Sequence, residues 1–174
     1  AAWQQVTDSN EQTQRLRHPL RGLSLEFRNF GYNEVLGYAI SATSYMVFPL
    51  LQTRKNLYLD LTVGTGIGYL TRCYNAVDNP LNNAIGSNWN GRVNLKLSLL
   101  RYFERFHLGG GIEFMHFSNG CITNPNLGLN SPSIFAQIGY NASQRQLAPG
   151  RTQLVKTMLN QPHNLTAEFI GSVK

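Results

Sequence analysis

The chain has 174 residues, a length typical of one domain, and a formal net charge of +6. Only 14% of its residues are charged, against roughly 25% in ordinary soluble domains, while glycine and aromatic residues are plentiful. No run approaches the roughly 18 apolar residues of a membrane-spanning helix, which excludes a helical membrane protein. The basic residues are scattered and form no nucleic-acid-binding motif, so we expect no nucleic-acid partner.

Apolar and polar residues alternate along most of the chain, and this period of two predicts β-strands. Residues 1–20 lack the pattern, so we expect an N-terminal arm there and one β-barrel domain over residues 21–174. The predicted strands cover residues 23–28, 38–48, 56–69, 89–99, 106–118, 133–141, 152–159 and 165–173. Short links alternate with long ones rich in Asn, Pro and Gly, as in bacterial outer-membrane barrels, for which eight is the smallest usual number of strands.

The polarity of the two strand faces separates a membrane barrel from a soluble one. One face is apolar almost throughout, and the other carries ionisable residues at mid-strand, namely Asp60, Arg92, Lys96 and Glu113. Because unpaired buried charges are costly, we predict that these four residues pair with one another across a narrow interior. The sequence therefore favours an all-β fold, an eight-stranded antiparallel transmembrane β-barrel with a polar lumen and an apolar exterior. A soluble β-sandwich or lipocalin-like barrel is the alternative.

The end of the fifth predicted strand carries the segment His116-Phe117-Ser118-Asn119. Strand residues two apart point to the same face, so His116 and Ser118 stand side by side on the apolar face. A histidine beside a serine suggests a general base and a nucleophile, and the apolar surface suggests a lipid substrate. Taken alone, the pair also fits two side chains that hydrogen-bond to loop backbone.

The residues around this pair resemble a known family. His116–Asn119 together with Pro125–Gly128 resembles the PagL family of outer-membrane lipid A 3-O-deacylases and is similar to the related acyloxyacyl hydrolases. The segments Gly66–Thr71 and Asn79–Ser87 are also similar to that group, and the resemblance covers Leu57–Tyr140. It implies a barrel in the bacterial outer membrane, lipid A or lipopolysaccharide as the substrate, and a serine-esterase site on the lipid-facing exterior near the outer leaflet.

Carried over residue by residue, the resemblance assigns Ser118 as the nucleophile and His116 as the general base. The candidates for the oxyanion hole and substrate contacts are Asn119, Gly120 and Asn126, because ester hydrolysis needs donors where the oxyanion forms. Turn chemistry also accounts for asparagine and glycine at these positions. The resemblance implies no cofactor, and no cluster of His, Cys, Asp or Glu in the sequence has metal-ligand spacing, so we predict no metal.

One position departs from the family pattern. The third triad member is usually acidic, and here it is Asn130, whose carbonyl can orient a histidine but lacks the charge that stabilises an imidazolium. Three alternatives remain open: Asn130 is the orienter, Asp78 supplies the carboxylate instead, or the chain binds lipid with little turnover. The sequence thus predicts an esterase that removes an ester-linked acyl chain of lipid A, or alternatively a non-catalytic structural or lipid-binding barrel.

The cysteines and the chain ends add smaller expectations. The sequence leaves two alternatives for Cys73 and Cys121, namely a disulfide between them or two free thiols. The N-terminus has neither the charged nor the apolar region of a signal peptide, as expected of a processed exported chain or of a cytosolic one. The chain does not end in the aromatic residue common in outer-membrane barrels, so we expect a truncated C-terminus or different pairing of the last strands. We expect a monomer or a homodimer.

Overall fold

The computed structural model describes residues 2–6, 19–53, 57–103, 106–140 and 164–166. Within these ranges the fold is all-β, as predicted, and no helix is long and apolar enough to cross a membrane. The strands are β1 (Ala2–Val6), β2 (Leu20–Asn29), β3 (Tyr38–Gln52), β4 (Leu57–Leu70), β5 (Trp89–Tyr102), β6 (Phe106–Ser118), β7 (Leu129–Tyr140) and β8 (Asn164–Thr166).

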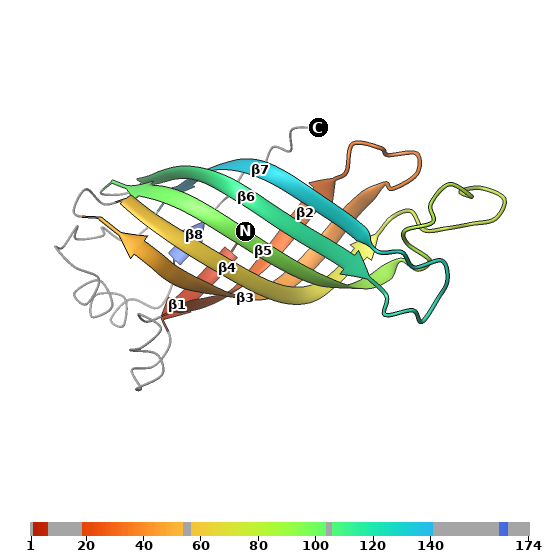
Figure 1. The fold of residues 1–174 in the computed structure, drawn as a ribbon, viewed down its shortest axis with the longest axis horizontal. Coiled ribbons are helices and arrows are strands. Elements are labelled where there is room, and N and C mark those ends of the chain that lie inside the picture. The colour runs from red at the N-terminus through yellow and green to blue at the C-terminus, as the bar shows by residue number, and fades with distance from the viewer. Residues whose placement is uncertain (1, 7–18, 54–56, 104–105, 141–163, 167–174) are drawn as a thin grey trace.

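The strands form one antiparallel sheet in the order β7-β6-β5-β4-β3-β2-β1-β8. The six long strands, β2 to β7, curve into a half-barrel (Figure 1). Most strands pair with their neighbours in the chain, because each turn returns the backbone directly beside the preceding strand. The segments 30–37, 71–88 and 119–128 all extend from one end of the sheet, called here the loop end (Figure 1).

The terminal strands differ from the prediction. The expected N-terminal arm contains β1, which pairs with β2 and β8, because polar residues without a clear period can still complete a sheet through backbone hydrogen bonds. The predicted strand 152–159 lies outside the described residues. Of the predicted strand 165–173, β8 covers the first two residues, and the remainder lies outside the described residues.

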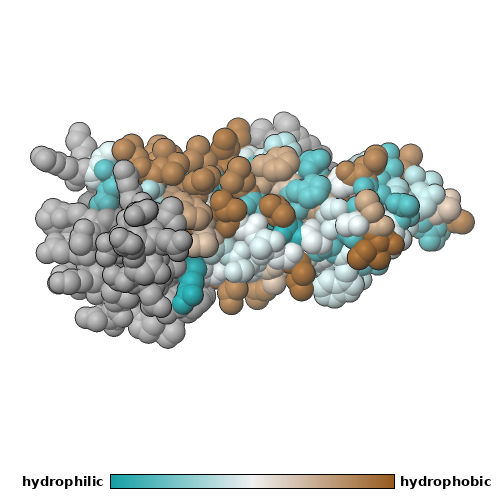
Figure 2. Space-filling model, turned by 60° about the horizontal axis from the view of Figure 1, so that its bottom comes forward, coloured by the Kyte–Doolittle hydropathy of each residue, from teal (hydrophilic) through white to brown (hydrophobic). Residues whose placement is uncertain are grey.

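The sheet has its apolar face outside and its polar face inside. On β5, Trp89, Val93 and Leu95 are exposed, while the alternating residues Arg92 and Lys96 are buried. Figure 2 shows hydrophobic atoms gathered over the sheet on the visible face, with more hydrophilic atoms toward the loop end. A large contiguous apolar exterior marks a surface that another apolar phase covers.

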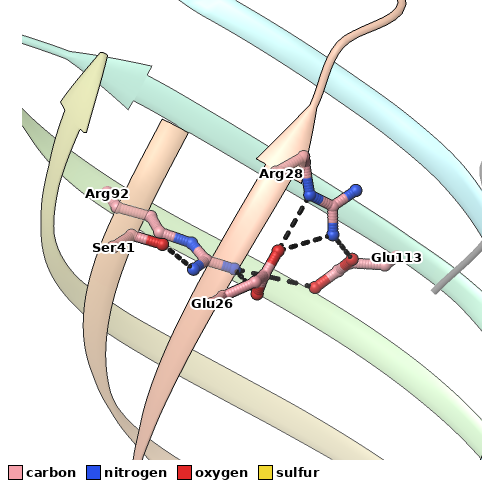
Figure 3. A network of polar contacts seen from close by, with 5 residues as sticks. All are labelled: Glu26, Arg28, Ser41, Arg92 and Glu113. Carbon is pink, nitrogen blue, oxygen red and sulfur yellow. Dashed lines mark hydrogen bonds and ion pairs between the residues drawn. The ribbon is translucent and has the colours of Figure 1, made fainter. Parts of the chain in front are cut away.

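An ion-pair network fills part of the interior between β2, β5 and β6 (Figure 3). Arg28 lies 2.6 Å from a carboxylate oxygen of Glu113 and 2.8 Å from one of Glu26. Arg92 lies 2.6 Å from the other oxygen of Glu26 and donates a hydrogen bond to Ser41. Charges of both signs therefore compensate one another, which buried ionised groups require.

This network adds two residues to the predicted pairing of the interior charges. Arg92 and Glu113 do meet, at 3.9 Å, but the shortest contacts come from Glu26 and Arg28, which the prediction omitted. Lys96 also has its Nζ 4.3 Å from the centroid of the Phe135 ring. The alternation identified the inward face correctly, whereas the pairing depends on the register between strands distant in the sequence.

A small apolar cluster lies in the interior near the loop end. Its buried members come from β3, β4, β6 and the 71–88 loop, and they are Ala39, Leu70, Ile85, Met115 and Phe117. Because Ile85 is fully buried here, the long 71–88 loop is anchored to the sheet beside the end of β6.

Candidate active site

The segment 116–118 ends β6 at the loop end of the sheet. His116 and Ser118 lie on the outward face and are half-buried, while Phe117 between them points inward and is 1% exposed. In the strand register His116 lies opposite Asn130 on β7, and Ser118 lies opposite Gly91 on β5. The two side chains thus share the apolar outer face, as the alternation predicted.

Asn130 contacts the histidine. Its Oδ1 lies 2.8 Å from Nδ1 of His116. Because an amide oxygen only accepts hydrogen bonds, Nδ1 carries the hydrogen in this arrangement, and the lone pair of the neutral ring lies on Nε2. The contact follows directly from the register, which places the two residues side by side across β6 and β7.

Gly128 fixes the position of the imidazole from the other side. Its φ is +78°, a left-handed conformation that favours glycine. A Cβ added at this position would lie 2.6 Å from Cε1 of the His116 ring. The backbone N–H of Gly128 donates to the carbonyl of Ala84 at 3.0 Å, so the 71–88 loop holds the glycine in place. Ala84 lies in the segment Asn79–Ser87 that resembles the family, but the sequence assigned it no role in the site.

The hydroxyl of Ser118 accepts two hydrogen bonds. Nδ2 of Asn126 lies 2.9 Å from Oγ, and the backbone nitrogen of Gly120 lies 3.2 Å from it. The orientation of the Asn126 amide is determined by the backbone N–H of Asn119, which donates to Oδ1 at 3.2 Å and so leaves Nδ2 facing the serine. Gly120 has a φ of +65°, a left-handed conformation that favours glycine in this turn. Two of the three predicted oxyanion candidates therefore aim donors at the serine.

The third candidate, Asn119, has a different geometry. Its side chain is buried and donates to Oγ of Ser87 at 3.2 Å and to the carbonyl oxygen of Thr123 at 2.9 Å. It therefore connects the 71–88 loop to the 119–128 loop instead of pointing at Ser118. Sequence reasoning missed Ser87, because its contact depends on how the two loops fold against each other.

Asp78, the alternative to Asn130, is exposed in the 71–88 loop. Its backbone nitrogen donates to Oδ1 of Asn75 at 3.0 Å, within a local turn closed by a bridge between Asn75 and Asn79. Nδ1 of His116 is paired with Asn130, so of the two candidates it is Asn130 that the structure brings to the histidine.

Both cysteines are free thiols, which resolves the alternative left open by the sequence. Sγ of Cys121 lies 3.7 Å from Nδ2 of Asn126, and Sγ of Cys73 lies 3.8 Å from Oδ1 of Asn88. Among the described residues, no group of three or more His, Cys, Asp or Glu side chains could hold a metal ion.

A histidine and a serine thus share the outer face of a curved antiparallel sheet whose exterior is apolar. A family model described as lipid A 3-O-deacylase (PagL) matches residues 1–141. The chain therefore belongs to the PagL family of outer-membrane β-barrel proteins, which are lipid A deacylases. Comparisons with curated proteins and with solved structures gave no match.

Proposed function

We propose that this protein is a serine esterase that hydrolyses an ester-linked acyl chain of lipid A in the bacterial outer membrane. The observation that carries the proposal is two sets of contacts, one at His116 and one at Ser118, on the same outward face at the end of β6. Oδ1 of Asn130 lies 2.8 Å from the His116 ring, and two donors converge on Oγ of Ser118. Membership of the PagL family supports lipid A as the substrate.

In the proposed mechanism His116 is the general base and Ser118 the nucleophile. Two residues along a strand span about 6.6 Å, a separation that an imidazole can bridge by leaning toward the serine. Nε2 of His116 takes the hydroxyl proton as Oγ attacks the ester carbonyl, and the same proton then leaves with the sugar hydroxyl. Water, activated by His116, hydrolyses the acyl-serine and releases the fatty acid.

The oxyanion of the tetrahedral intermediate needs donors that are in position before the reaction. Nδ2 of Asn126 and the backbone N–H of Gly120 supply two, since both already point at Ser118. In comparable sites one such donor contributes about 10²–10³ in kcat. Asn119 serves this site indirectly, by orienting the Asn126 amide through its backbone N–H.

Asn130 is the proposed orienter of His116. Its carbonyl oxygen selects the tautomer with hydrogen on Nδ1, as the third member of a triad must. A neutral amide stabilises the imidazolium less than a carboxylate would, so we expect lower activity than in a site with an acidic residue. The neutral amide at position 130 is also the observation that favours the second candidate function, a non-catalytic structural or lipid-binding barrel.

In this proposal the site lies at the membrane boundary. The 13 residues of β6 extend about 40 Å, or roughly 30 Å along the membrane normal at the usual strand tilt, close to the apolar band of about 25 Å in such barrels. Exposed aromatic residues lie at both ends of the band, with Phe27, Tyr69 and Trp89 at the loop end and Phe106 and Tyr140 at the other. Ser118, at the loop end of β6, is therefore level with the aromatic residues at the loop end of the band.

A closed eight-stranded barrel completes the proposal. The sheet ends at β7 on one side and at β8 on the other. Unpaired backbone N–H and C=O groups are too costly in lipid for an open edge, so we propose that β7 and β8 close the barrel around the polar interior. Lipopolysaccharide is the proposed partner, and no cofactor is required by the proposed chemistry.

The proposed activity is tested by measuring fatty acid released from lipopolysaccharide by the folded protein in detergent or in vesicles. The wild type should release product, and Ser118→Ala and His116→Ala should reduce the rate to background. Equal release by the wild type and Ser118→Ala would refute the esterase. Binding of lipid A by the wild type without any product would support the non-catalytic barrel instead.

A further inference from the structure

Gly91 lies beside the proposed nucleophile on the outer face of the sheet. It is the third residue of β5, and in the register it is opposite Ser118 on β6 and Ile67 on β4. The pairing of β5 with β4 runs through Gly91 without a shift in register. The pairing of β5 with β6 begins at Gly91 and also shows no shift, so the residue does not form a β-bulge. It is exposed, as its outward position requires.

Within the described part of the chain, no contact or backbone angle requires a glycine at this position. The φ of Gly91 is outside the left-handed region. Among the atoms of the described residues, an added Cβ would meet one within 4 Å, the carbonyl oxygen of Ser118 at 3.4 Å, which is an ordinary van der Waals contact. By contrast, a Cβ at Gly66 would lie 2.8 Å from Cα of Thr43, so close backbone approach does require that glycine.

Glycine inside a strand weakens it, because it packs no side chain and loses more backbone entropy than other residues. Where a strand nevertheless contains glycine, the residue often marks a bulge, a close approach of neighbouring backbone, or a ligand that comes close to the strand. The first two do not hold for Gly91. The open space above it, directly beside Oγ of Ser118 in the register, therefore belongs to a ligand.

The surroundings indicate the chemistry of that ligand. Apart from Ser118 on β6, the outward side chains next to Gly91 along β5 and opposite it on β4 are apolar and exposed, with Ile67 at 59%, Trp89 at 64% and Val93 at 52%. Leu95 continues the same row along β5 toward the middle of the apolar band. A hydrocarbon chain fits such a row, whereas a sugar or phosphate would leave its polar groups unpaired there.

The opposite flank of β6 is already filled. On the β7 side, the Asn130 amide contacts His116, and the backbone of Gly128 packs against the imidazole ring. A substrate held at Ser118 therefore has its open side toward β5. An acyl chain that leaves the ester carbonyl in this direction crosses Gly91 first and then follows Val93 and Leu95 into the membrane.

We propose that the acyl chain to be removed crosses β5 at Gly91, and that the missing side chain at this position admits the carbons nearest the scissile ester. Gly91 is then a specificity-determining residue, and this inference rests on the proposed esterase function. A side chain at position 91 should obstruct long acyl chains and leave an acetyl group, which ends before it reaches β5, unaffected.

The test compares p-nitrophenyl acetate with p-nitrophenyl decanoate as substrates of the folded full chain. In Gly91→Leu, kcat/KM for the decanoate should fall by about 10- to 100-fold, while that for the acetate should change by less than about twofold. Gly91→Ala, whose Cβ fits the structure, should show a smaller loss in the same direction. Ala136 is an exposed outward residue on β7 opposite Gly110, and Ala136→Leu is the matched control. Its kcat/KM should equal that of the wild type for both esters.

Two outcomes would overturn the inference. If Gly91→Leu retains its activity on the decanoate, the acyl chain does not cross this position. If Gly91→Leu loses activity equally on both esters, the substitution disturbs the site in general. The failure of the proposed function looks different. If the wild type and Ser118→Ala hydrolyse both esters at the same rate, the esterase itself is refuted, whatever the Gly91 variants do.

Discussion

The Asn126 amide provides the sharpest test of the proposed oxyanion hole. Asn126→Asp keeps the size of the side chain and an oxygen to accept the Asn119 backbone N–H, but it replaces the Nδ2 donor by an acceptor. One of the two donors aimed at Ser118 is thereby lost, and a negative charge is placed where the oxyanion forms. Asn126→Ala removes the same donor without adding the charge.

The size of the effect follows from the contacts. The Nδ2 donor lies 2.9 Å from Oγ of Ser118 and the Gly120 nitrogen lies 3.2 Å from it, so Asn126→Ala removes one of two donors at the nucleophile. Loss of one oxyanion donor typically costs about 2.7–4 kcal/mol, or about 10²–10³ in kcat. Asn126→Ala should fall in this range, and Asn126→Asp should be at least as impaired. The KM should change little, because the donor acts mainly in the transition state.

The assay is steady-state hydrolysis of a soluble ester together with acyl release from lipopolysaccharide. Asn33→Asp is a suitable control, because it makes the same chemical change at an exposed asparagine in the 30–37 loop that contacts the Tyr38 hydroxyl. It should retain the wild-type rate. If Asn126→Ala also retains kcat within about threefold of the wild type, the Asn126 amide is not an oxyanion donor.

Three further predictions concern the orienter, the glycine under the imidazole and the interior charges. Asn130→Asp should raise kcat about tenfold, since a charge-assisted bond to His116 is roughly 1–1.5 kcal/mol stronger than a neutral one, and an unchanged or lower kcat would count against the orienting role. Gly128→Ala should lower both kcat and stability, because a non-glycine residue at φ +78° costs about 1–3 kcal/mol and its Cβ displaces the His116 ring; wild-type kinetics would contradict this. Glu113→Ala should lower the free energy of unfolding by about 3–5 kcal/mol, measured by urea titration in micelles, because Arg28 loses its partner at 2.6 Å, and an unchanged midpoint would refute the role of the network.

The strands that carry the site were predictable from the sequence. In β4, β5 and β6 the alternation is strict enough to fix the strand and its outward face, so His116 and Ser118 were placed together on the apolar side. Strand β1 was missed, because its polar residues carry no period and its pairing depends on backbone hydrogen bonds that any sequence can make.

The finer geometry of the site was not predictable in the same way. The contact between His116 and Asn130 depends on the register of β7, which is set by how the 119–128 loop folds. The direction of the Asn126 amide depends on a backbone N–H that becomes visible only once the turn around Gly120 is built. The resemblance pointed to Asn119, Gly120 and Asn126 together, but the different contacts of Asn119 and Asn126 are seen only in three dimensions.

The central claim, that Ser118 is the nucleophile of a lipid A deacylase, is tested most directly by trapping the acyl-enzyme. The protein is mixed with lipopolysaccharide, quenched in acid within the first turnover, digested and analysed by mass spectrometry. The account predicts a fatty-acyl adduct on the peptide that contains Ser118, together with lipid A that has lost that same acyl chain. Deacylated lipid A formed without any adduct on Ser118, or equally by Ser118→Ala, would contradict it.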